Sequence, residues 1–327
     1  MLPVVAVLVG APLSAEYLQA YLATTGQALA LVGGVVFFAP LYGGAALLIR
    51  EVALRTGRGW PCRLLLAAAF GLAMTGVVDL SLFGRSRADI PYWEQLRAPT
   101  AIDALGLSVA PALTWVAGHV VMSVGAPLAL LDALAPSHRG RPLLGRWGTA
   151  ALALAGAGVA AFVFVDGRRT YGYVPTWWQA GAVLAVVALL IVLAVRPPAR
   201  APRAPAGQAR AARPVPAAAV LGLGGVGKVA LDVIPPTWPG VALDLGVLAA
   251  VVVSVAWWDR HRLWGPREIG LLGGVAVLAG AVLGFTTPVP DGGSPLGKNL
   301  QSALFVVVAL ALVVLVLRRT PGRAPRT

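Results

Sequence analysis

Hydrophobic residues occur along this chain in ten long runs, separated by short segments rich in charge, proline or glycine. A helix needs about 20 apolar residues (range about 17–25) to cross roughly 30 Å of hydrocarbon, and each run has a length close to this. The pattern predicts an all-α fold, a polytopic transmembrane bundle of about ten spans. The predicted spans are 2–22, 27–49, 63–84, 106–131, 147–165, 177–196, 216–235, 239–258, 268–286 and 301–318.

The first run is less regular than the others, because Glu16 and the break at Gly10 to Pro12 interrupt it. It has no basic residue before it and is longer than the core of a signal peptide, so we interpret it as a retained helix. The alternative is a helix lying flat on the outer surface, which leaves nine spans and places the N-terminus outside.

Lys and Arg alternate in density from one connection to the next. Nineteen of the 26 lie in five segments, 50–63, 139–146, 196–213, 260–267 and 318–326; six lie in the other connections and Lys228 lies inside a run. Cytoplasmic loops of membrane proteins retain Lys and Arg. The basic segments are therefore predicted to be cytoplasmic, as are both termini, in a multi-pass protein of the plasma membrane.

The composition is typical of a membrane protein and excludes a soluble globular domain. Hydrophobic residues make up 58% of the chain and charged residues 12%, with a mean hydropathy of +0.80; soluble domains carry roughly 25% charged residues. The net charge of +13 is confined to short loops beside apolar runs. Attraction of these loops to anionic lipids therefore explains the charge better than nucleic-acid binding.

The segment 197–216, rich in Pro, Ala and Arg, contains too few large apolar residues to form a core and is predicted to be a disordered cytoplasmic linker. It divides the chain into a six-helix part (1–196) and a four-helix part (217–318), followed by a tail (319–327). We interpret the linker as a tether whose charge enforces topology, with partner binding as the alternative.

Ionisable residues inside apolar runs are candidates for function, because a charge in hydrocarbon is costly. Four acids, Glu16, Asp79, Asp232 and Asp244, fall in the outer third of their predicted helices. Facing a common cavity, they would form an electronegative vestibule that holds a cation or shuttles protons. Alternatively, each one caps a helix or reaches the headgroups alone.

His119 is the ionisable residue predicted deepest in the membrane, near the middle of the fourth span. An imidazole titrates near neutrality and suits a proton relay with a carboxylate such as Asp79. The alternative is a neutral side chain hydrogen-bonded to a neighbouring helix. Because no second histidine lies in a span and Cys62 is the only cysteine, no metal site and no cofactor are predicted.

Lys228 and Asp232 are four residues apart on one predicted helix and are expected to form an intrahelical ion pair. The glycines before Lys228 (GLGGVGK) imitate a phosphate-binding loop. Val229, however, stands where the magnesium-binding hydroxyl should be, and no strand precedes the glycines, so close helix packing explains them better.

About a third of the chain is similar to a group of actinobacterial multi-span membrane proteins of uncharacterised function. The similar segments are YGGAALLIRE (42–51), GRGWP (57–61), AFG (69–71) and SLF (81–83), together with His119 followed by Ser123 and the segment 136–146. From this resemblance we expect the related proteins to have a pair of glutamates in their third span.

That glutamate pair, with a later histidine, distantly resembles the CPBP family of intramembrane proteases, in which paired glutamates and histidines activate a water molecule. In this chain the corresponding residues are Met74 and Thr75, and neither can act as a general base. Asp79 can replace one acid but not a pair. The resemblance therefore implies an inactive member or one with another use.

Three functions are consistent with these features. The first is proton- or cation-coupled transport of a small molecule, with Glu16, Asp79, His119 and Asp244 as the candidate site. The second is a non-catalytic scaffold or partner subunit, for which the outer loop from Arg85 to Asp103 is the natural docking element. The third is a divergent CPBP-like hydrolase. No catalytic residue is assigned, and a protein that is not an enzyme is favoured.

Overall fold

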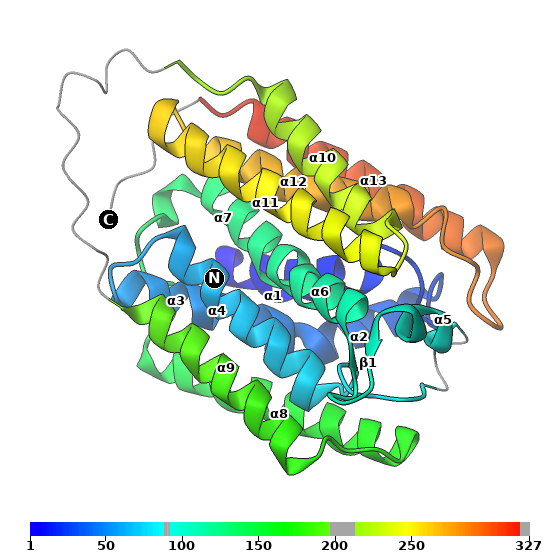
Figure 1. Cartoon of the computed structure of the whole chain (residues 1–327). Coiled ribbons are helices and arrows are strands. Elements are labelled where there is room, and N and C mark those ends of the chain that lie inside the picture. Colours follow the sequence, from blue (N-terminus) through cyan, green and yellow to red (C-terminus); the bar gives the residue numbers. More distant parts are fainter. Residues whose placement is uncertain (88–89, 91, 197–212, 321–327) are drawn as a thin grey trace.

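The structure, a computed structural model, describes residues 1–87, 90, 92–196 and 213–320, and most of them lie in helices (Figure 1). The prediction of an all-α fold is confirmed. Two short strands, β1 (Ala101–Ile102) and β2 (Leu107–Ser108), pair as an antiparallel hairpin. Most of the predicted linker and of the predicted tail lies outside the described residues.

Eight helices in the described part of the chain are long and apolar enough to cross a membrane. Three of them are built from consecutive α- and π-helical segments. They are α2 (Ala28–Phe38), η2 (Ala39–Gly43) and α3 (Gly44–Arg55); α4 (Trp60–Ala73) and η3 (Met74–Val78); and α6 (Val109–Gly118), η5 (His119–Gly125) and α7 (Ala126–Leu134). The other five are α8 (Arg146–Tyr171), α9 (Trp177–Val195), α11 (Trp238–His261), α12 (Pro266–Leu283) and α13 (Pro295–Leu317).

The two remaining predicted spans correspond to shorter helices. α1 (Leu2–Pro12) continues into the π-helix η1 (Leu13–Tyr17), and α10 covers Ala217–Val233. The 16 residues of α1 and η1 are about 24 Å long at about 1.5 Å per residue, less than the roughly 30 Å of hydrocarbon. The first helix ends at Tyr17, five residues before the predicted limit at residue 22. The count of ten spans and the cytoplasmic termini stay predictions.

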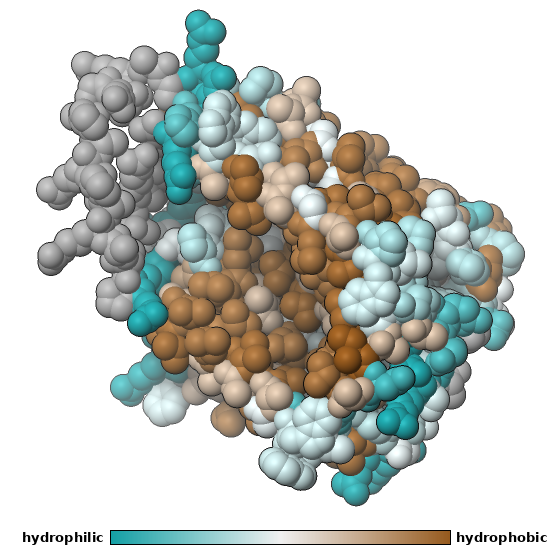
Figure 2. Space-filling model, in the orientation of Figure 1, coloured by the Kyte–Doolittle hydropathy of each residue, from teal (hydrophilic) through white to brown (hydrophobic). Residues whose placement is uncertain are grey.

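The long helices run roughly side by side, with α10 to α13 along one edge of the bundle and α8 and α9 along the opposite edge (Figure 1). Short elements, α5 (Trp93–Arg97), η4 (Ala98–Thr100) and η6 (Pro136–His138), lie at the two ends. Polar residues gather at these ends, and the surface between them is mainly apolar (Figure 2). Long apolar helices and an apolar outer surface are features of an integral membrane protein.

Helices α7 and α12 meet along a seam of small residues. A methyl group at Gly270 would lie 2.4 Å from Ala133 Cβ, and one at Gly273 would lie 2.8 Å from Ala129 Cβ. Close backbone approach of this kind replaces the hydrophobic driving force that helices lack inside a bilayer. The seam joins the six helices that precede the 197–212 gap to the four that follow it.

At the basic end of the bundle, a buried arginine holds a loop against α3. Arg50 is 0% exposed, and its guanidinium donates to the carbonyl oxygens of His138 (2.7 Å) and Arg141 (3.0 Å). The neighbouring Glu51 is 1% exposed, and its Oε1 accepts from the backbone N–H groups of Leu143 (2.6 Å) and Leu144 (3.2 Å). Two of the segments that resemble other multi-span membrane proteins, 42–51 and 136–146, therefore contact each other.

A second buried ion pair joins α4 to α7. Arg63 Nη1 lies 2.5 Å from Asp132 Oδ2, and both side chains are largely buried. Arg55 Nη2 lies 3.0 Å from Glu51 Oε2 and so supplies the positive charge that Glu51 requires. The charges of Glu51 and Asp132 are thus compensated inside the protein, which ties α3, α4, α7 and the loop before α8 together.

Replacing Gly273 by alanine should destabilise the protein, because the added methyl group overlaps Ala129 and the backbone of Ala126, 3.1 Å away. Overpacking of this kind costs about 1–3 kcal/mol. Gly246→Ala on α11 is the matched control, since no atom lies within 4 Å of its added methyl group. Thermal unfolding in detergent should show a lower Tm for Gly273→Ala alone; equal Tm values would contradict the close packing of α7 and α12.

Candidate functional site

Four apolar helices contain π-helical segments: η2 and η5 lie within their helices, and η1 and η3 form the last turns of theirs. π-Helical turns are rare and frequently mark functional sites, because they widen the helix and redirect side chains. In η2 the cause includes Pro40, which has no N–H to donate. Three of the segments carry a cluster of polar side chains: Glu16 from η1, Tyr42 from η2, and His119 with Ser123 from η5.

Glu16 is held by two tyrosine hydroxyls. Tyr42 donates its hydroxyl to Glu16 Oε1, and Tyr21, in the loop after η1, donates to Oε2 at 2.5 Å. Among the described residues no basic side chain forms a salt bridge with this carboxylate. Each carboxylate oxygen therefore has a neutral donor, and no cation fixes its charge.

His119 packs against Tyr42. The two rings stack with centroids 5.9 Å apart and an interplanar angle of 20°, and Phe70 meets the imidazole edge-on at 5.7 Å. His119 Nδ1 lies 3.0 Å from Ser123 Oγ, one helical turn away. Gly71 lets α4 pack against the histidine, because a methyl group at Gly71 would lie 2.9 Å from His119 Cβ. We define the polar cluster as Glu16, Tyr42, His119 and Ser123.

Asp79 does not lie within a helix, and its assignment to the third span is wrong. η3 ends at Val78, six residues before the predicted limit. The Asp79 side chain accepts from the backbone N–H of Ser81 (2.8 Å) and from its hydroxyl (2.6 Å), while Leu80 has a positive φ of 63°. This local turn competes with the helix and ends it. Asp79 is within electrostatic range of the Tyr21 hydroxyl, which places it at the edge of the polar cluster.

Asp244 is buried in α11, with 1% of its surface exposed. In the described part of the chain its Oδ1 has no hydrogen-bond partner, and it makes no polar contact with Glu16, Asp79 or His119. Of the four predicted site residues, the structure thus brings Glu16 and His119 together through Tyr42, leaves Asp79 nearby and places Asp244 elsewhere.

Lys228 donates to Asp232 one turn along α10. Three of the glycines that imitate a phosphate-binding loop, Gly224, Gly225 and Gly227, face neighbouring helices: a methyl group at Gly224 would lie 2.7 Å from Val275 of α12, and one at Gly227 would lie 3.3 Å from Val251 of α11. These positions serve helix packing.

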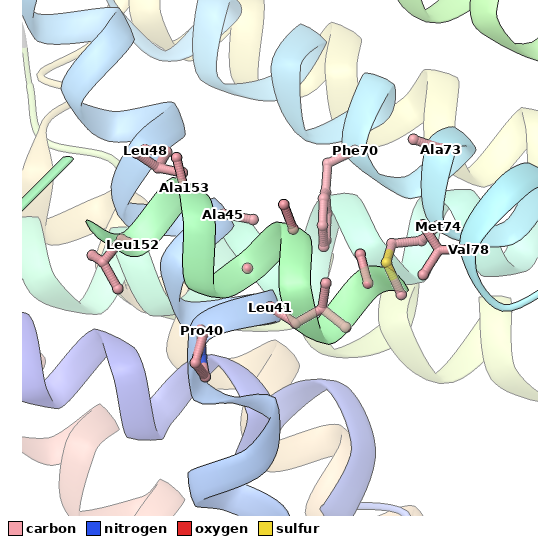
Figure 3. A pocket seen from close by; sticks show the side chains of 13 residues that line it. Pro40, Leu41, Ala45, Leu48, Phe70, Ala73, Met74, Val78, Leu152 and Ala153 are labelled. Atoms are coloured by element: carbon pink, nitrogen blue, oxygen red, sulfur yellow. The ribbon is translucent and has the colours of Figure 1, made fainter. Parts of the chain in front are cut away.

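Met74 and Thr75, where the resemblance leads us to expect glutamates, have no acid–base role in this geometry. Met74 lines an apolar pocket of about 220 Å³ together with Phe70, Leu41 and residues of α8 (Figure 3). Thr75 donates its hydroxyl to the carbonyl of Gly71, 3.1 Å away in its own helix. Within the described residues no group of three or more His, Cys, Asp or Glu side chains is arranged to hold a metal ion.

The sequence did not indicate Tyr42 or Tyr21 as site residues, because tyrosine is ordinary in membrane helices and only its neighbours in space give it a role. Ser123 carried a usable signal: it stands four residues after His119 and so lies on the same helical face.

The chain matches no protein-family model, and neither the curated proteins nor the solved structures contain a significant match to it.

Tyr42→Phe should destabilise the protein, because it leaves one oxygen of the half-buried Glu16 carboxylate without its tyrosine donor. The expected loss in the free energy of unfolding is about 1–3 kcal/mol. Tyr92→Phe is the control, since Tyr92 is 48% exposed. Thermal unfolding of both variants measures the difference; a Tyr42→Phe protein as stable as Tyr92→Phe would contradict the role of this hydrogen bond.

Proposed function

We propose that this protein is a proton- or cation-coupled transporter of a small molecule, with Glu16 as the residue that binds the coupling ion. The observation that carries the proposal is the environment of the Glu16 carboxylate, which two tyrosine hydroxyls hold beside His119 without a neutralising cation. A carboxylate inside a membrane bundle without a cationic partner is poised to bind a proton or a small cation.

The π-helical segments η1, η2 and η5 support this proposal. Helices broken within the membrane commonly form the binding sites of secondary transporters, because their irregular turns allow movement between states. Glu16, Tyr42 and His119 all belong to such segments. A change in protonation at Glu16 would therefore be transmitted directly to three helices.

The proposal places the protein in the plasma membrane with its basic loops and both termini in the cytoplasm. The unequal distribution of Lys and Arg supports this orientation, and the same loops would contact anionic lipids.

A divergent CPBP-like hydrolase is a second candidate, favoured by the presence of a carboxylate near His119. Glu16 would have to act as the base, because the acidic pair is replaced by Met74 and Thr75. A third candidate is a scaffold that binds a partner at the outer loop. There Trp93 is buried and stacks on Trp115 at 5.3 Å, which holds the loop in place, while Tyr92 and Glu94 remain exposed.

Transport is tested with proteoliposomes that contain a pH-sensitive dye and carry an inside-negative potassium diffusion potential. Amino acids, sugars, organic cations and inorganic cations are added outside, one class at a time. The wild-type protein should acidify the lumen with at least one class, and Glu16→Gln should abolish this acidification because glutamine cannot release a proton.

The matched control is Asp259→Asn, which removes an exposed acid of α11 and should retain the wild-type flux. Ion-coupled transport through Glu16 would be contradicted by equal flux in wild type and Glu16→Gln. Cleavage of peptides by wild type but not by Glu16→Gln would favour the hydrolase instead. Recovery of a stoichiometric partner that is lost on changing Tyr92 would favour the scaffold.

A further inference from the structure

An apolar groove of about 370 Å³ runs between α1 and α13, with α7 and α12 as its floor. Its walls include Gly10, Leu134, Phe305 and Leu312. The hydroxyl of Ser14, the polar side chain of this lining, is bonded to the carbonyl of Met122 at 2.5 Å and so offers little to a ligand. The groove therefore presents an apolar surface to whatever occupies it.

The groove opens toward the lipid-facing surface and is long enough for a lipid tail. Leu2 and Val308, which both line it, are 80% and 47% exposed. Its lining extends along the first helix from Leu2 to Leu18, a length of about 24 Å at about 1.5 Å per residue. One leaflet of a bilayer is about half of the roughly 30 Å hydrocarbon core, so an acyl chain lying parallel to α1 would fit.

Two arginines stand at the end of the groove where α7 ends. Arg139 donates from Nε to the carbonyl of Asp132 and from Nη2 to the carbonyl of Ala133 (3.2 Å). Arg319 donates from Nη2 to the carbonyl of Leu134 at 3.1 Å, and Leu134 lines the groove. The carbonyl end of α7 thus holds both guanidinium groups close to Leu134 of the groove lining.

The positive charge of this arginine pair has no acidic partner of its own. Asp132 forms its ion pair with Arg63, and among the described residues no carboxylate forms a salt bridge with Arg139 or Arg319. Burial lowers the pKa of Arg139, Asp132 opposes this, and the nearby guanidinium of Arg319 lowers the pKa further. The two cations thus repel each other, and an anion between them would relieve the repulsion.

We propose that the groove and the arginine pair bind an anionic phospholipid, with an acyl chain along α1 and the phosphate between Arg139 and Arg319. Guanidinium groups match phosphate geometry and retain N–H donors beyond those bonded to α7. The adjoining groove favours a phospholipid over a free phosphate, because only the phospholipid has an acyl chain that can cover the apolar lining of the groove. This site is independent of the polar cluster and of the proposed transport.

The test is native mass spectrometry of the full chain in detergent, titrated with phosphatidylglycerol or with phosphatidylcholine of the same acyl chains. The wild type should retain one phosphatidylglycerol in preference to phosphatidylcholine. Arg139→Gln and Arg319→Gln should each weaken phosphatidylglycerol about fivefold, which corresponds to about 1 kcal/mol per basic residue. Arg318→Gln, an exposed neighbour at the end of α13, should leave the affinity unchanged.

A separate variant tests the acyl chain. Gly10→Leu places a side chain in the groove, where no atom lies within 4 Å of the added Cβ. It should reduce retention of phosphatidylglycerol, whereas Gly33→Leu on α2, where the space is also open, should not. Since Gly10→Leu and exposed Arg319→Gln leave the core intact, the test does not depend on the more buried Arg139.

Equal retention of the two lipids by the wild type would overturn the proposal. So would unchanged phosphatidylglycerol binding in Gly10→Leu or in both arginine variants. Inorganic phosphate that displaces phosphatidylglycerol at equal concentration would also overturn it, by showing that the site binds the free anion and not the lipid.

Discussion

The structure depends on how charge is compensated inside an apolar bundle. Arg50 and Glu51 are fully buried and lie 3.8 Å apart as an ion pair, and both also bond to backbone groups of the loop before α8. Breaking such an arrangement leaves an uncompensated charge, which typically costs 3–5 kcal/mol. Because α3 continues directly from η2, fixing its far end also fixes the position of Tyr42, and through Tyr42 the polar cluster.

Charge is compensated differently at the polar cluster than at the basic end of the bundle. At the basic end, Arg63 faces Asp132 and Arg55 faces Glu51, so each of these two buried carboxylates has a fixed positive partner. Glu16 has only neutral hydroxyl donors. Glu16, a carboxylate without a basic partner, thus lies where the π-helical segments η1, η2 and η5 meet. This contrast between paired charges that hold the bundle and an unpaired carboxylate within it is the physical basis of the proposed function.

Much of the fold could be predicted from the sequence, because each long helix corresponds to one hydrophobic run. The predicted end of a helix is wrong where a local interaction competes with the helix. Asp79 accepts hydrogen bonds from Ser81, and the third helix ends early. Arg50 was counted among loop charges because its partners, the carbonyls of His138 and Arg141, lie about 90 residues away in the chain.

For the site, Glu16 and His119 could be identified because ionisable residues are rare in apolar runs. Tyr42 could not, since its importance comes from contacts with two other helices. The π-helical segments were also missed. Their positions depend on how the helices pack and, in η2, on Pro40. A π-helical turn contains one additional residue, which is too small a change to be seen in the hydrophobic pattern.

The central claim is that Glu16 gains and loses a proton inside the membrane, and infrared difference spectroscopy tests it most directly. Spectra of the reconstituted protein in acidic and in neutral buffer should differ by a carboxylic acid C=O band. We expect this band to be absent in Glu16→Gln, shifted in frequency in Tyr42→Phe because a hydrogen bond to the carboxyl group is lost, and unchanged in Asp259→Asn. A band that persists in Glu16→Gln with full intensity would contradict the account, because the titrating carboxyl group would then lie elsewhere.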